Sequence, residues 1–261
     1  MDIFIFIMIF IAGTVFGSFY SLAVYRIPRK ENITYVQSHC VSCNHKLGLM
    51  DLIPIWSYIF LKGRCRYCKE KIRSRYVLLE VTSGFTFLLI ALFLKINVYS
   101  SILEFINLFV IYLFVTAVFI IGGIDKEHHI IPDSLILYLS LISILKIIVN
   151  AFMEISAISN IIGFLVIPII LLIINLVLSK LNKENFKISF GIIKYLAFLG
   201  LFFGFKGQII IILFMLITVG IVNIFHKYEK IPFGFYISVV TILYMIFGSY
   251  LSNAMSLIFI C

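Results

Sequence analysis

Long apolar runs separated by short polar breaks dominate this sequence. Crossing the hydrocarbon core of a bilayer takes about 20 residues of α-helix, and eight runs are of about that length. In chain order the predicted spans cover residues 2–24, 76–94, 102–124, 131–150, 157–179, 188–204, 208–225 and 231–252. The expected fold class is therefore an all-α polytopic membrane protein with about eight transmembrane helices.

One long polar segment, residues 25–75, interrupts this pattern. It carries eleven of the 21 Lys and Arg residues and only three acidic residues. Short loops rich in Lys and Arg stay on the cytoplasmic side of a membrane, so this segment is expected in the cytoplasm. The chain is thus divided into a first transmembrane helix (1–24), a cytoplasmic tetracysteine segment (25–75) and a helical membrane domain (76–261).

The other loop charges agree with this orientation. The loops expected in the cytoplasm contain six lysines, namely Lys126, Lys180, Lys183, Lys187, Lys227 and Lys230. The loops expected outside contain only Lys95 and Lys206. Eight spans then place both termini outside the cytoplasm, in a multi-pass membrane protein.

The amino-acid composition limits the kinds of molecule with which this protein can associate. Apolar residues make up 62% of the chain, and the mean hydropathy is +1.15, which excludes a soluble domain of this size. The net charge of +9 is concentrated in the polar segment, where topology and anionic headgroups explain it. We therefore expect the lipid bilayer as a partner, and no nucleic acid.

Four cysteines in the polar segment have metal-ligand spacing. Cys40 and Cys43 form one Cys-x-x-Cys pair, and Cys65 and Cys68 form a second pair after 21 intervening residues. This spacing predicts one structural Zn²⁺ held by four thiolates, a closed site with no position for a catalytic water. Disulfides, a redox pair and idle thiols are the alternatives, although disulfides need an oxidising compartment. No role is assigned to Cys261.

A few polar side chains lie within the predicted spans. The ionisable ones, interpreted as groups that reach a membrane interface, are Glu80, Glu104 and Lys146. The amides, interpreted as interhelical hydrogen-bond partners, are Asn107, Asn160 and Asn175. Because these groups do not gather as charges at the membrane midplane, a transporter or channel is disfavoured.

The segment between the third and fourth predicted spans carries the candidate chemistry. Asp125 follows an apolar run directly, and it can be read either as an interfacial charge or as a catalytic carboxylate. Pro132 suits the first position of the next helix, with Asp133 stabilising the first turn. His128 and His129 are adjacent in sequence, so they are poorly placed as a metal pair.

These motifs together resemble the type IV prepilin leader peptidases, which are membrane aspartyl proteases. The matching stretches, in chain order, are Gly17-Ser18-Phe19, Tyr25-Arg26-Ile27-Pro28, the tetracysteine segment with Asp51-Leu52-Ile53-Pro54 and Ser57-Tyr58, Arg75-Tyr76 with Glu80, Ile124-Asp125, Ile131-Pro132-Asp133 and Ile231-Pro232-Phe233-Gly234. The resemblance implies cleavage of a prepilin leader at the cytoplasmic face. It also implies N-methylation of the new terminus with S-adenosylmethionine, and it puts the first catalytic aspartate at Asp125.

The sequence departs from this family at the second catalytic aspartate. The family motif Gly-x-Gly-Asp-x-Lys corresponds here to Ser189-Phe190-Gly191-Ile192-Ile193-Lys194, so Ile192 stands where the aspartate is expected. Aspartyl proteolysis needs one carboxylate to help deprotonate water and another to polarise the peptide carbonyl, and isoleucine does neither. The candidate substitutes, none of them well placed, are Glu184, Glu127 and Asp133.

The sequence therefore predicts a prepilin peptidase by architecture that is protease-inactive as written. Either deliberate inactivation or natural degeneration explains Ile192. Two alternatives stay open, namely a methyltransferase that does not cleave and a membrane protein that binds prepilins without modifying them.

Overall fold

The structure is a computed structural model that describes residues 2–33, 37–181, 188–225 and 231–258. Those residues form helices and loops without a β-strand, apart from two isolated bridges in the cysteine segment. The chain divides into two compact units, residues 1–100 and 101–261. Each unit has its own internal packing and is described by itself.

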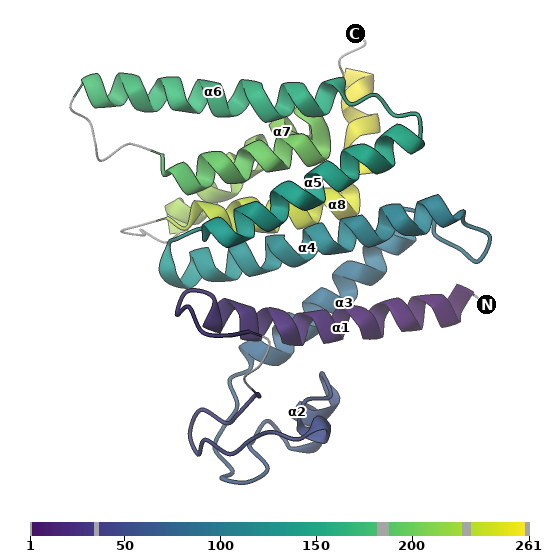
Figure 1. Cartoon of the computed structure of the whole chain (residues 1–261), viewed down its shortest axis with the longest axis vertical. Helices are drawn as coiled ribbons and strands as arrows, with labels where there is room; N and C mark the ends of the chain where they lie inside the picture. The colour runs from purple at the N-terminus through teal and green to yellow at the C-terminus, as the bar shows by residue number, and fades with distance from the viewer. Residues whose placement is uncertain (1, 34–36, 182–187, 226–230, 259–261) are drawn as a thin grey trace. The chain divides into compact units, whose positions relative to one another are not determined.

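The first unit pairs two apolar helices with the cysteine segment. Its elements are α1 (Asp2–Arg26), the 3₁₀ helix η1 (Leu49–Asp51), α2 (Trp56–Phe60) and α3 (Arg75–Phe93). Helices α1 and α3 cross (Figure 1) at a point where glycines let their backbones approach. A Cβ at Gly17 would lie 2.6 Å from the Glu80 Cα, and one at Gly13 would lie 2.9 Å from the Gly84 Cα. The Gly13-x-x-x-Gly17 pair is a common helix-contact pattern in membranes.

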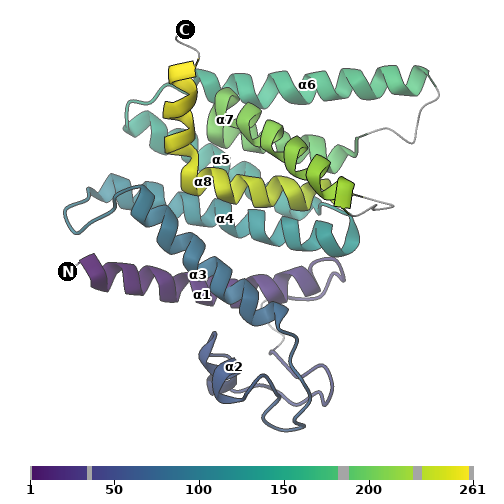
Figure 2. The same ribbon diagram turned by 180° about the vertical axis from the view of Figure 1, so that it is seen from behind.

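The second unit is a bundle of five elements. They are α4 (Ile102–His128), α5 (Asp133–Phe152), α6 (Ile158–Lys180), α7 (Phe190–Phe225) and α8 (Phe233–Ile258). Helix α4 packs against α5 and α8, while α7 packs against α5, α6 and α8, as the reverse view shows (Figure 2). The core of this unit therefore lies between α4 and α7.

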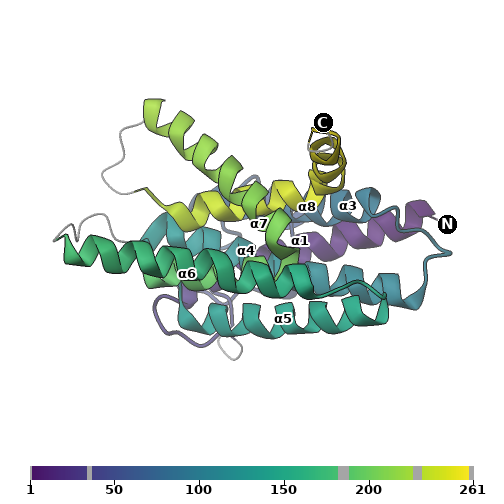
Figure 3. The same ribbon diagram turned by 90° about the horizontal axis from the view of Figure 1, so that it is seen from above.

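Helix α7 consists of two arms joined at Gly204. The backbone of Gly204 has φ 77° and ψ 172°, a conformation that only glycine adopts without strain. The Gln208 Nε2 donates a hydrogen bond of 2.8 Å to the carbonyl of Leu196, whereas twelve residues of straight helix would separate these positions by about 18 Å. The chain thus reverses at Gly204, and the two arms run at an angle to each other (Figure 3).

The predicted fold class is confirmed. Among the described residues, six helices are long and apolar enough to cross a membrane, and a shorter apolar helix covers Phe233–Gly248. The predicted spans 188–204 and 208–225 correspond to the two arms of α7. The predicted functional division at residues 24/25 and 75/76 stays a prediction, as does the orientation of the chain. Several residues of these predictions lie outside the described part, namely Lys183, Glu184, Lys187, Lys227, Lys230 and Cys261.

The amides within the spans connect elements, as predicted. Asn107 accepts a hydrogen bond from Lys146 between α4 and α5, and Asn160 donates to the Leu201 carbonyl between α6 and α7. The side chain of Asn175 bonds both the N–H and the C=O of Ile188, just before α7.

Candidate functional site

The four cysteines of the first unit form one compact cluster. Their Sγ atoms all lie within 4.8 Å of one another, and the Cys40 and Cys68 sulfurs are 3.8 Å apart. A tetrahedral Zn²⁺ with bonds of about 2.3 Å requires sulfurs about 3.8 Å apart. The Cys43 backbone amide lowers the pKa of the Cys40 thiol to about 6, whereas the Glu70 amide is outweighed at Cys68, where burial and the neighbouring thiols raise the pKa. The cluster can therefore hold a metal ion.

Two turns of the same construction present these sulfurs. In the first, the Cys40 N–H donates to the His45 carbonyl and the Asn44 N–H donates to the Cys40 carbonyl. In the second turn, 25 residues later, the Cys65 N–H donates to the Glu70 carbonyl and the Lys69 N–H donates to the Cys65 carbonyl. Asn44 and Lys69 both have positive φ, 56° and 62° respectively. Each Cys-x-x-Cys pair thus folds as a local turn that aims both sulfurs at one point.

Other side chains join the two turns independently of a metal. The Arg66 Nε lies 2.6 Å from the Asp51 Oδ1, and the rings of His45 and Tyr67 contact each other at a tilt of 37° with centroids 3.6 Å apart. Burial by itself would raise the pKa of the Asp51 carboxyl, but hydrogen bonds from Arg66 and Gly48 hold that pKa below its usual range. Asp51 therefore ties η1 to the second turn.

Glu80 connects the cysteine segment to α3. Its Oε2 accepts a hydrogen bond of 2.7 Å from the Ile55 backbone N–H, immediately before α2. Ser18 on α1 also bonds this carboxylate. Glu80 thus joins α1, α2 and α3 of the first unit.

Asp125 is buried near the C-terminal end of α4. Only 5% of the residue is exposed, and its Oδ2 accepts a hydrogen bond of 3.0 Å from the Phe235 backbone N–H. Phe235 belongs to the first turn of α8, where the helix dipole and unpaired amides favour a negative charge. A Cβ at Gly234 would lie 2.9 Å from the Asp125 Cγ, so only glycine leaves room for this carboxyl group.

A buried polar pair lies beneath Asp125. The Tyr195 hydroxyl lies 3.0 Å from the Ser238 Oγ, which in turn donates to the Gly234 carbonyl at 2.8 Å. This chain of contacts links the first arm of α7 to the start of α8 beside Asp125. Neither residue is among those predicted from the sequence. The only available signal is helical spacing, since each lies four residues after a motif glycine, Gly191 or Gly234.

The segment that contains Ile192 forms the first turn of α7. The Ser189 Oγ accepts from the Ile192 N–H at 3.4 Å, as a residue that caps a helix does. A Cβ at Gly191 would lie 3.2 Å from the Ile131 Cβ, so this turn packs closely on the α4–α5 connection. Ile192 itself is half-buried.

Lys194 and Asp133 form an ion pair at the same end of the bundle. The Lys194 Nζ lies 2.7 Å from the Asp133 Oδ1, and both side chains are substantially exposed. Asp133 is in the first turn of α5, as predicted, although Pro132 precedes the helix as its cap residue rather than occupying its first position. The bond joins the first turns of α5 and α7.

Two of the three candidate substitutes for the second aspartate lie in the described part of the chain. Asp133 is engaged with Lys194, Glu127 is exposed on the last turn of α4, and Glu184 lies outside the described residues. His128 is the last residue of α4, and His129 caps it with φ 53°.

Both units of this chain are similar in sequence to known proteins. The family model of the bacterial peptidase A24 N-terminal domain matches residues 11–94. A "Prepilin leader peptidase/N-methyltransferase" of Aeromonas hydrophila is 24% identical over 286 residues, which cover 95% of this chain and 94% of that protein. Proteins with the same name from Burkholderia pseudomallei (strain 1026b) and Klebsiella pneumoniae are each 29% identical, over 80% and 49% of this chain.

The extent of these matches differs among the relatives. The chain spans 66% of the Burkholderia protein and about half, 56%, of the Klebsiella protein. No solved structure is significantly similar to this chain. The similarity to proteins of this name nevertheless covers the cysteine segment, Asp125 and the position of Ile192.

Proposed function

This chain is similar along nearly its whole length to bacterial prepilin leader peptidase/N-methyltransferases, and on that premise we propose that it has the architecture of a prepilin peptidase but lacks proteolysis because of Ile192. The proposed substrate is a prepilin or pilin-like protein, bound at the cytoplasmic face of a bacterial cytoplasmic membrane. In this proposal Asp125 is the remaining carboxylate of an aspartyl pair. S-adenosylmethionine is the proposed methyl donor by resemblance alone.

A structural Zn²⁺ is the ion proposed for the four cysteines. The spacing of their sulfurs fits a tetrahedral ion of this size, and four thiolates suit Zn²⁺ better than they suit Mg²⁺ or Ca²⁺. With all four positions taken by sulfur, the ion would stabilise the fold of the segment and would not activate water. Cys40, Cys43, Cys65 and Cys68 would hold it.

The position of Asp125 carries the proposal for the membrane domain. Its carboxyl group is buried, yet it lies at the end of α4 and at the first turn of α8. In the proposed orientation this end of the bundle faces the cytoplasm, where the substrate would bind. The Phe235 N–H fixes one oxygen, which holds the group in a single orientation. In a complete pair this carboxylate would share the transfer of protons between water and the peptide carbonyl.

Ile192 decides the activity in this proposal. An aspartate at 192 would be the third residue of α7, where the helix dipole stabilises a negative charge and Ser189 already acts as a cap. Gly191, packed on Ile131, and Lys194, paired with Asp133, hold that first turn in place. The surrounding turn therefore suits a carboxylate that the chain does not have.

The test is leader cleavage by purified protein on a prepilin that carries its leader. We expect Ile192→Asp to cleave, and the chain as given to be slower by at least about 100-fold, because a positioned acid or base contributes that much. Asp125→Asn in the Ile192→Asp background is the control, since asparagine keeps an acceptor for the Phe235 N–H. Similar cleavage by the unmodified chain would overturn the assignment of Ile192.

Ile192 itself favours a second function that needs no carboxylate pair. A chain that has lost proteolysis can still bind a prepilin, or methylate one that has already been cleaved. Transfer of labelled methyl groups from S-adenosylmethionine to a precleaved pilin would indicate a methyltransferase. Binding of the prepilin with neither reaction would indicate a binding protein.

A further inference from the structure

The cysteine segment carries a cluster of exposed apolar side chains, although the segment as a whole is rich in charged residues. We call this cluster the apolar patch, and it consists of Leu49, Met50, Ile53, Trp56, Ile59 and Phe60. The exposed fractions of Leu49, Met50, Trp56 and Phe60 are 88, 71, 60 and 76%. An exposed apolar cluster of this kind on a charged segment indicates a surface that is covered in the working protein.

The depth of the patch relative to the membrane follows from Glu80. Helix α3 begins at Arg75 and is one of the candidate spans, so Glu80 lies about 7.5 Å along the helix axis from its start. The interfacial zone on each side of a bilayer is about 5–8 Å thick, which is half the difference between its full and hydrocarbon thickness. Because the Ile55 N–H bonds Glu80, α2 begins at the depth where headgroups meet acyl chains.

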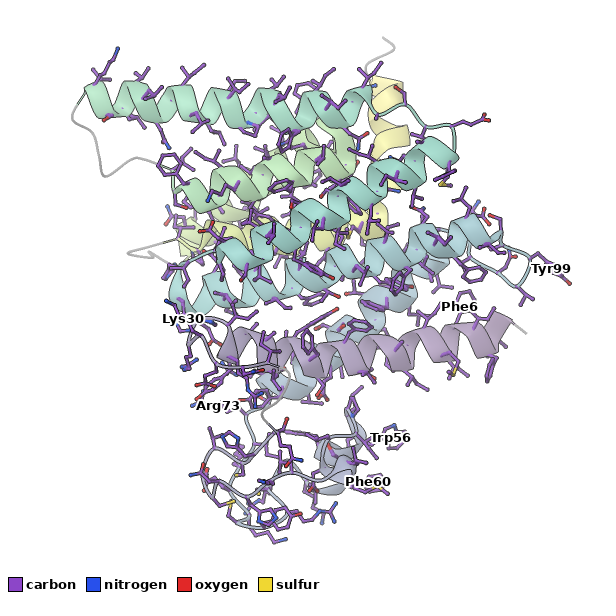
Figure 4. All side chains as sticks on the ribbon, in the orientation of Figure 1. Phe6, Lys30, Trp56, Phe60, Arg73 and Tyr99 are labelled. Atoms are coloured by element: carbon purple, nitrogen blue, oxygen red, sulfur yellow. The ribbon has the colours of Figure 1, made fainter. Side chains whose placement is uncertain are left out.

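Trp56 and Phe60 of the patch are displaced along the direction of α1 from the basic end of the unit (Figure 4). In Figure 4, Trp56 and Phe60 lie further along α1 toward the end that bears Phe6, whereas Lys30 and Arg73 lie at the opposite, basic end. The rings of Trp56 and Phe60 also stack, with centroids 6.0 Å apart, and together form one apolar face of α2. For α1 and α3 spanning a membrane, this arrangement puts both aromatic rings nearer the hydrocarbon than Lys30 and Arg73.

The charge around the patch fits a lipid surface. Residues 25–75 hold eleven Lys and Arg residues and three acids, an excess that attracts anionic headgroups. Tryptophan is the side chain most typical of the membrane interface, where an apolar ring and a polar N–H are both satisfied. An exposed apolar face on a segment with an excess of Lys and Arg is typical of elements that lie in this zone.

We propose that the apolar patch inserts into the interfacial zone of the bilayer beside α1 and α3, and so holds the cysteine segment flat against the membrane. The occupant of this surface is lipid. The proposal does not depend on proteolysis, on methyl transfer or on the identity of the metal ion.

Trp56 provides a direct test, because it is the only tryptophan of the chain. The whole protein would be placed in bilayers of phosphatidylcholine and phosphatidylglycerol whose acyl chains carry bromine near the headgroup or deeper. We expect the shallow bromines to quench Trp56 fluorescence at least twofold, the deep bromines to quench it less, and aqueous acrylamide to have little effect.

A matched control moves the tryptophan to another exposed apolar position of the same segment. Val41 is 72% exposed and lies between the cysteines of the first turn, outside the patch. In the double variant Trp56→Phe and Val41→Trp, we expect strong quenching by acrylamide and little by brominated lipid. A second variant, Leu49→Ser with Phe60→Ser, keeps Trp56 and should lower the quenching by lipid while bound metal is retained.

The remaining outcomes would each overturn the proposal. Trp56 that is quenched by acrylamide and not by brominated lipid would face water. Trp56 that is protected from both quenchers would be covered by protein, either by another part of this chain or by a bound partner.

Discussion

The Glu80 carboxylate accepts a 2.7 Å hydrogen bond from the backbone N–H of Ile55, a residue held at φ 63°. A β-branched residue rarely adopts positive φ, so the backbone is strained at this point and the bond helps to maintain it. One carboxylate in a membrane-spanning helix therefore sets the start of α2 and, with it, the placement of the apolar patch.

We expect Glu80→Ala to loosen this connection. The N–H of Ile55 would lose a charged acceptor, whose contribution is about 1.5–3 kcal/mol, and the strain at Ile55 would favour release. Amide hydrogen exchange over residues 55–60 should accelerate by at least about tenfold, while exchange in α1 and α3 changes little. Glu80→Gln keeps an acceptor and should have a smaller effect. Equal exchange in Glu80→Ala and the parent would show that the bond contributes nothing.

Removal of one cysteine pair should release the metal. In Cys40→Ser with Cys43→Ser, two thiolates are lost, so we expect zinc measured by mass spectrometry to fall from about one ion per chain to near zero. The spans should remain inserted, because their apolar faces do not involve this site. Ser42→Ala, between the same two cysteines, is the matched control. Unchanged zinc in the double variant would refute the metal assignment.

The ion pair between Asp51 and Arg66 should make the stability of the cysteine segment fall at low pH. The pKa of Asp51 in the folded chain lies below the unfolded value, so its contribution is present above the unfolded pKa of about 3.9 and is lost as the pH falls through the folded pKa. Asp51→Asn should therefore be less protected from hydrogen exchange than the parent at pH 6, and the difference should vanish in stronger acid. A difference that persisted unchanged in strong acid would contradict this account.

The backbone reversal in α7 should tolerate no residue other than glycine at position 204. In Gly204→Ala, the backbone would keep a strained conformation and the new Cβ would lie 2.8 Å from the Ser159 Oγ. We expect a loss of about 1–3 kcal/mol in the free energy of unfolding, seen as a lower Tm in detergent. Gly220→Ala is the matched control on the second arm, where a Cβ meets nothing within 4 Å, and it should raise stability slightly. Equal Tm values would argue against the reversal.

The packing of Gly234 on Asp125 predicts an effect on cleavage. In the Ile192→Asp background, Gly234→Ala would push its Cβ against the Asp125 carboxyl and displace that group. A misplaced catalytic group can lose about 100-fold in rate, and we expect a loss of that size in the cleavage assay. Gly220→Ala in the same background should cleave normally. Full activity of the Gly234→Ala variant would show that Asp125 needs no fixed position.

The apolar pattern predicted the helices well because a bilayer leaves little freedom. Each span needs a long apolar run, and the sequence shows each run and break directly. The pattern cannot reveal the grouping of α1 with α3, because helices in lipid recognise each other through small residues such as Gly13 and Gly17 rather than through an apolar stripe. It also cannot reveal a backbone reversal that depends on the φ of Gly204.

The candidate sites differ in how far the sequence predicts them. The cysteine spacing is local, so the cluster of sulfurs follows from two short turns. Glu104 accepts a hydrogen bond from the Ser101 N–H at the start of α4, and Ser101-Ile-Leu-Glu104 is a capping signal that the sequence contains but that its interpretation as an interfacial charge leaves out. Tyr195 and Ser238 meet only through the packing of α7 on α8, which no local pattern encodes.

The bond between Asp125 and Phe235 gives the two positions of the proposed pair unequal freedom to change during evolution. A carboxylate at 192 would add a favourable charge to the first turn of α7, but that turn also forms with isoleucine there. Asp125 also bonds the first turn of α8, so its loss would remove a contact that holds this turn and leave the Phe235 N–H with the Pro232 carbonyl alone. A lineage released from selection for proteolysis would therefore lose the second aspartate first. The presence of Asp125 in a chain that lacks the second aspartate reflects the structural contact that Asp125 makes. It is not by itself evidence of proteolytic activity.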